Sequence, residues 1–87
     1  MKVSQFEGNN GPVRNQFIVR DDVGNVYFQS YDSLIVKRGI DGTITLDEQT
    51  WDYSKTTGKY RNQFLRETKK ETENKIKCGI YKLGNLN

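Results

Sequence analysis

The chain has 87 residues, 33% of them hydrophobic, which is enough for one domain with a small core. It contains no histidine and one cysteine, so histidine-dependent acyl transfer, a zinc site and an internal disulfide are all disfavoured. No apolar stretch approaches the roughly 20 residues of a membrane span, and no signal segment is recognisable at the start. We therefore expect one soluble domain over residues 1–87, in the cytoplasm of the cell that makes it, without membrane contact or cofactor.

The formal net charge of +3 is unevenly distributed along the chain. Residues 1–50 carry five basic and seven acidic side chains, whereas residues 51–87 carry nine basic and four acidic ones. A basic half favours attraction to phosphate or to an acidic protein surface. Residues 67–77 alternate in sign, as in an ordinary solvated helix, but residues 55–66 have a positive excess that such a helix does not require.

Runs rich in β-branched and aromatic residues, separated by turn residues, predict strands in the first half. In chain order these runs cover residues 3–7, 13–20, 26–31, 34–38 and 43–46. Within the second run, alternation places Phe17 and Val19 on one face and leaves Ile18 on the other, polar face. The pair Asp41-Gly42 is the strongest hairpin signal in the chain.

The pattern changes after Leu46. Asp47 or Thr50 is expected to cap a short turn, and residues 54–58 are polar and are expected to form a loop. Residues 59–66 have helical spacing, which places three apolar side chains on one buried stripe. These are Tyr60, Phe64 and Leu65.

A second helix, or a continuation of the first, is expected over residues 69–78. Thr68 and Glu71 have the spacing of a capping box, and Gly79 stands where a C-terminal glycine cap belongs. Residues 80–83 are a candidate last strand. The predicted fold is therefore α+β, with an antiparallel sheet of four to five strands, mostly from residues 2–46. One or two helices from residues 59–78 pack on one face of it, and an exposed sheet edge makes a homodimer plausible.

Acidic residues offer two weak candidates for chemistry. Asp47, Glu48 and Asp52 lie close enough in sequence to bind Mg²⁺, but negative charge at the start of a helical turn is the simpler explanation. Glu71, Glu73 and Lys75 resemble half of a metal nuclease motif, yet they fall in a predicted exposed helix rather than a strand. We therefore expect a protein that is not an enzyme.

The segment from residue 51 to residue 66 interleaves aromatic and basic side chains. Rings that stack on bases, beside cations that neutralise phosphate, hold single-stranded nucleic acid. The same residue types supply most of the energy of protein interfaces, and the rings could also belong to the core. The candidate binding residues are Trp51, Tyr53, Lys55, Lys59, Tyr60, Arg61 and Arg66.

The stretches Phe28–Ile35 and Trp51–Leu65, the latter reading WDYSKTTGKYRNQFL, resemble an uncharacterised family of small proteins encoded by bacteriophages and related mobile elements. The resemblance covers roughly residues 26–87 and includes the Gly-x-Tyr-x-Leu pattern that begins at Gly79. It implies a genomic setting and brings no reaction, cofactor or catalytic residue. Short proteins in that setting are often accessory binders, including inhibitors of host defence nucleases.

The leading hypothesis is a non-enzymatic binding protein that acts on a host protein or nucleoprotein complex in the host cell cytoplasm. A counter-defence inhibitor, such as an anti-CRISPR protein, is one concrete form. At a net charge of +3 it would not work by imitating DNA. The alternative hypothesis is direct nucleic-acid binding during phage replication or transcription, with affinity that falls steeply with salt.

Overall fold

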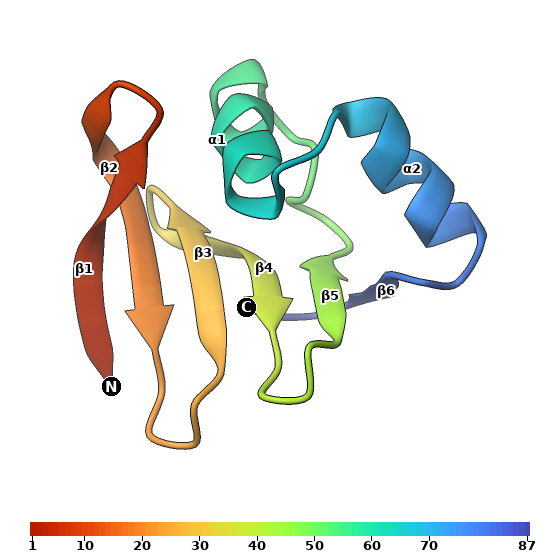
Figure 1. Cartoon of the computed structure of the whole chain (residues 1–87), viewed down its shortest axis with the longest axis horizontal. Helices are drawn as coiled ribbons and strands as arrows, with labels where there is room; N and C mark the ends of the chain where they lie inside the picture. The colour runs from red at the N-terminus through yellow and green to blue at the C-terminus, as the bar shows by residue number, and fades with distance from the viewer.

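Six strands form one sheet, and both helices lie on the same side of it, in a computed structural model that describes residues 1–87 (Figure 1). The strands follow one another across the sheet in chain order, and every neighbouring pair is antiparallel except β5 and β6, which are parallel. The predicted α+β fold is confirmed, with one strand more than expected. The elements are β1 (Lys2–Gly8), β2 (Gly11–Arg20), β3 (Val26–Ser30), β4 (Ser33–Arg38), β5 (Ile44–Asp47), α1 (Lys55–Leu65), α2 (Lys69–Lys77) and β6 (Lys82–Gly84).

The β2–β3 connection is organised by one carboxylate. Asp21 accepts hydrogen bonds from the backbone N–H groups of Val23, Gly24 and Asn25. Gly24 has a φ of 109°, which a residue with a Cβ rarely adopts. Hydrogen bonds, led by that from the Asn25 side chain, hold the pKa of Asp21 down at about 2, against the opposing effect of desolvation.

The helices cover the sheet face that carries Ile18. The register pairs Ile18 with Phe28 and Phe28 with Val36, so these side chains form one apolar row beneath α1. Val19 is buried on the opposite face, where it lines a shallow hollow together with Leu34 of β4. The predicted alternation of residues 13–20 is therefore correct. The helices cover the face of this strand that was predicted to be polar, the face that carries Ile18.

A cluster of aromatic rings joins α1 to the sheet. The Phe28 ring lies between Phe6, at a centroid distance of 5.3 Å, and Phe64, at 5.8 Å. Tyr60 and Leu65 also pack against this core, which confirms the predicted apolar stripe of the helix. Burial of such rings dominates the stability of a domain this small.

Helix α1 begins at Lys55, four residues earlier than predicted. Ser54 is the N-cap, and its hydroxyl accepts the backbone N–H of Thr57 at 3.1 Å. The Thr57 hydroxyl is fully buried and lies 2.9 Å from the hydroxyl of Ser30 on β3. The cap and this tertiary contact outweigh the weak helix propensity of the segment, so the predicted loop over residues 54–58 is wrong. The turn before it is capped by Asp47, as expected.

Helix α2 begins with the predicted capping box between Thr68 and Glu71. Neither α1 nor α2 has the length and apolar composition that a membrane crossing requires. Strand β6 covers residues 82–84 rather than 80–83. The shift arises because the backbone N–H of Tyr81 donates to the Lys75 carbonyl at 3.0 Å and is therefore not available to pair with β5.

The Ser30–Thr57 contact gives a first prediction. Thr57→Val keeps the shape but leaves the Ser30 hydroxyl without a partner, so we expect the free energy of unfolding to fall by about 1–2 kcal/mol. Urea denaturation measures this loss, with the exposed neighbour Thr56→Val as the matched control. The double variant Ser30→Ala/Thr57→Val removes both hydroxyls. Its loss in the free energy of unfolding is expected to be smaller than the sum of the losses in Ser30→Ala and Thr57→Val. Additive losses would contradict the coupling.

Candidate binding site

The structure divides the predicted binding segment between the interior and the surface. Trp51 and Tyr60 are half-buried and pack against the core, and Arg61 is fully buried. The remaining four candidates, Tyr53, Lys55, Lys59 and Arg66, are exposed. The surface therefore keeps three of the four predicted cations and only one of the three predicted stacking rings.

Arg61 was predicted on the binding surface, but the structure buries it, which leaves its guanidinium almost no surface for a partner to contact. Only 1% of its surface is exposed. Its guanidinium donates to the Trp51 carbonyl at 2.5 Å and to Asp52 Oδ1 at 3.3 Å, and it lies 5.2 Å from the centre of the Trp51 ring. These contacts hold Trp51 and Asp52, which precede α1 in the chain, against the buried side of that helix. Sequence spacing gives no signal for them, because they depend on how that segment folds back.

Asp52 connects the two helices. Besides Arg61 of α1, it binds Lys69 at the start of α2, with an Nζ–Oδ2 distance of 2.8 Å. Burial acts to raise the pKa of Asp52, but the hydrogen bonds from Lys69 and Arg61 outweigh it and hold this pKa below its ordinary value. Asp52 is therefore an ion-pair partner and does not join Asp47 in a metal site.

Two other acidic candidates, Asp47 and Glu71, are also engaged in hydrogen bonds of the fold. Asp47 is buried and accepts the backbone N–H groups of Gln49, Thr50 and Leu86. Across the chain, no three Asp, Glu or Cys side chains come close enough together to hold a metal ion. Glu71 serves the capping box of α2.

The outer side of α1 carries a basic stripe. Lys55 and Lys59 are four residues apart, so they lie one above the other on the solvent side of the helix. Neither is in an ion pair, and the Lys59 ammonium lies 5.3 Å from the centre of the Tyr60 ring. An open hollow of about 620 Å³ separates this stripe from the start of α2, and the exposed ring of Tyr53 lines it.

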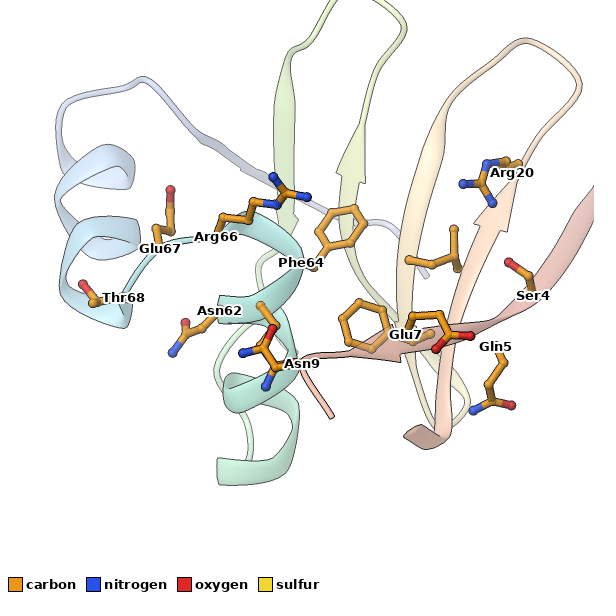
Figure 2. Close-up of a pocket in the computed structure, with 13 residues that line it drawn as sticks. Ser4, Gln5, Glu7, Asn9, Arg20, Asn62, Phe64, Arg66, Glu67 and Thr68 are labelled. Carbon is orange, nitrogen blue, oxygen red and sulfur yellow. The ribbon is translucent and has the colours of Figure 1, made fainter. Parts of the chain in front are cut away.

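A larger hollow lies on the other side of α1, between the C-terminal end of that helix and strand β1 (Figure 2). We call it the helix-side groove, and its volume is about 950 Å³. Its floor includes Phe6, Ile18 and Phe64, and its borders are polar. Figure 2 shows Arg66 and Arg20 on either side of Phe64, with Arg66 at the end of α1 and Arg20 on β2.

The two arginines of the groove have no carboxylate partner. Glu67 also lines the groove, but its carboxylate is turned toward Lys75, Thr72 and Tyr81, which donate to it at 2.7, 2.5 and 2.7 Å. Glu7 is the other acidic residue of the groove, and it is in no ion pair. The groove therefore presents two free cations against one free carboxylate.

Glu67 accepts hydrogen bonds from three side chains, and 4% of its own side chain is exposed. Burial raises its pKa, but the hydrogen bonds from Lys75, Thr72 and Tyr81 more than compensate, so the net shift is downward. Desolvation, followed by the bond to Glu67, raises the pKa of Tyr81. This cluster fixes α2 against the core, next to the groove.

A family model matches residues 1–79, which is most of the chain and includes both helices. The chain belongs to the family of unknown function DUF8033. Membership confirms the expectation of an uncharacterised family. The matched region contains the whole helix-side groove and the basic stripe of α1, whereas Tyr81 and β6 follow it. Comparison with curated proteins and comparison with solved structures both gave no match.

Sequence reasoning found Arg66 but not the groove in which it lies. Arg20 and Phe6 come from strands far from α1 in the chain, and only the sheet register and the packing of α1 bring them together. The uncompensated positive charge of residues 55–66 was the available signal. It did not indicate which other strand would contribute.

Proposed function

We propose that this member of the DUF8033 family is a non-enzymatic binding protein that recognises another protein through its helix-side groove. The observation that carries the proposal is that Arg20 and Arg66, two arginines without a carboxylate partner, line the same hollow of about 950 Å³ as the Phe64 ring. An apolar floor with a few placed charges is the usual composition of a protein-binding surface. The partner is expected to present carboxylates to the two arginines.

A protein partner is favoured over nucleic acid for two reasons. Trp51 and Tyr60 pack against the core, so two of the three rings that were candidates for stacking on bases are not freely available. The groove also has an apolar floor that includes Phe6, Ile18 and Phe64, which a protein partner can cover with apolar side chains and a phosphate backbone cannot.

Direct nucleic-acid binding is the second candidate, and a different surface favours it. Lys55 and Lys59 have no carboxylate partner and lie beside Tyr53, whose surface is 49% exposed. Binding there would weaken steeply as salt is raised and would be lost in Lys55→Gln/Lys59→Gln. Mobility shifts at low salt with single- and double-stranded DNA and RNA test this candidate.

The biological setting is part of the proposal. The resemblance of residues 26–87 to small phage and mobile-element proteins supports an accessory role in such an element, for example as a counter-defence inhibitor of a host nuclease. In that role the protein would occupy an acidic regulatory or nucleic-acid-facing patch of its target, consistent with its net charge of +3.

The proposal is tested with three baits in a nuclease-treated host lysate. Arg20→Gln/Arg66→Gln removes both groove cations, and Lys77→Gln/Lys82→Gln removes two exposed, unpaired cations elsewhere. We expect a stoichiometric partner of the wild-type protein to bind the groove variant at least about tenfold more weakly, and the control variant nearly as well, because charge pairs at an interface are specific to their position. Equal recovery on all three baits, or no stoichiometric partner, would contradict the proposal.

A further inference from the structure

Strand β1 has one free edge. It is the terminal strand of the sheet and pairs only with β2, so alternate N–H and C=O groups along it point to solvent. It has seven residues, whereas β6 at the opposite border has three. In Figure 1 no helix lies beyond β1, while α2 and its connection lie near the β6 side. The edge of β1 is therefore where a further strand can be added.

The first part of this edge is regular and uncovered. Residues 2–5 pair with β2 in continuous register, and the bulge comes only between Gln5 and Glu7. The side chains of residues 2–5 are all exposed, and the buried residue of the strand is Phe6. An exposed, regular edge of this length can form main-chain hydrogen bonds with an extended segment of another chain.

The cations next to the edge of β1 favour an added segment that carries carboxylates. Lys2 lies directly across from Arg20 in the ladder, so the two cations share one face of the sheet, and Arg20 lines the groove that also holds Arg66. None of the three is paired with a carboxylate. A strand that lies beside β1 places alternate side chains on this same face. Carboxylates at those positions would meet the cations.

We propose that the edge of β1 over residues 2–5 binds an extended, acidic segment of the partner protein as an additional strand, with its carboxylates beside Lys2, Arg20 and Arg66. This inference rests on the proposed protein-binding function and gives it a geometry and a partner chemistry. A second copy of this chain is a poorer occupant. Its own β1 carries one lysine and one glutamate, so it brings as many cations as carboxylates.

The test uses ¹⁵N-labelled protein and end-blocked peptides that isolate one property each. A peptide of alternating Glu and Val has both the charge and the backbone donors of an acidic strand. A peptide of alternating Glu and Pro keeps the charge, but it has half the backbone N–H groups and cannot continue a β-ladder. Alternating Lys and Val reverses the charge. We expect the Glu-Val peptide to shift the signals of Arg20 and Arg66 and to slow hydrogen exchange of the outward amides of residues 2–5 about tenfold or more.

Matched variants and further probes complete the test. Arg20→Gln/Arg66→Gln is expected to weaken Glu-Val binding about tenfold, whereas Lys82→Gln leaves it unchanged. Equal binding of Glu-Val and Glu-Pro without slowed exchange would overturn strand addition and leave groove binding in place. Three other results would also overturn it: no response to Glu-Val, a stronger response to an oligothymidylate, or outward β1 amides already protected in a dimer detected by light scattering.

Discussion

Arg61→Met is expected to lower the free energy of unfolding by about 3 kcal/mol, the largest loss among the charged side chains of this protein. Methionine keeps the apolar stem of arginine but removes the donors to the Trp51 carbonyl, Asp52 and Asn62. The Asp52 carboxylate then keeps only Lys69 as an ionic partner. Urea denaturation followed by Trp51 fluorescence measures the loss at the residue that the guanidinium contacts.

Lys59→Met is the matched control for Arg61, because it makes the same chemical change on the exposed side of α1. It is expected to change stability by less than about 0.5 kcal/mol. Arg61→Lys is expected to recover little of the stability that Arg61→Met loses, since an ammonium cannot reach all three acceptors that the planar guanidinium contacts. A stable Arg61→Met protein that has lost partner binding would show that Arg61 is a contact residue after all.

Glu67→Gln is expected to lower the free energy of unfolding by about 2 kcal/mol at neutral pH. The amide is nearly the same size, but it removes the charge that Lys75 neutralises. It also replaces one acceptor oxygen by a donor, which would face either Tyr81 and Lys75 at the Oε1 position or Thr72 at the Oε2 position. Lys75 is partly exposed, so solvent screening limits its share of the loss. Glu73→Gln, on α2 and in no ion pair, is the control and is expected to be nearly neutral.

The pH dependence of stability identifies Glu67 as the source of this loss. Its pKa in the folded protein lies below the ordinary value of 4.5, so its contribution is present above that value and disappears as the pH falls through the folded-state pKa. The stability difference between the wild-type protein and Glu67→Gln should therefore be full at pH 7 and shrink on acidification below about 4.5. A difference that is constant down to pH 2.5 would contradict the ionised hydrogen-bonded cluster.

Local patterns predicted most of the fold. Runs of β-branched and aromatic residues between turn residues located the strands of residues 2–46, and the spacing of Tyr60, Phe64 and Leu65 identified the buried side of α1. The start of α1 was missed because Thr57 is a weak helix former whose place depends on Ser30, a contact between distant parts of the chain. Helix propensity carries no information about such a contact.

The candidate site was less predictable than the fold. Arg61 and Lys59 look equivalent in sequence, yet one is buried against Trp51 and the other is exposed, because they lie on opposite sides of one helix. The groove combines Arg66 with Arg20, which belongs to the acidic half of the chain. Charge counts over halves of a sequence cannot reveal a positive site that both halves build.

The most direct test of the central claim is photo-crosslinking in cells. The photoreactive amino acid benzoylphenylalanine is placed at Ser4, on the groove side of β1, or at Lys82, on the opposite border of the sheet. A protein-binding groove predicts a discrete protein adduct from position 4 that is absent from position 82 and is lost when Arg20→Gln/Arg66→Gln is added. Equal adducts from both positions, or adducts to nucleic acid alone, would contradict the account.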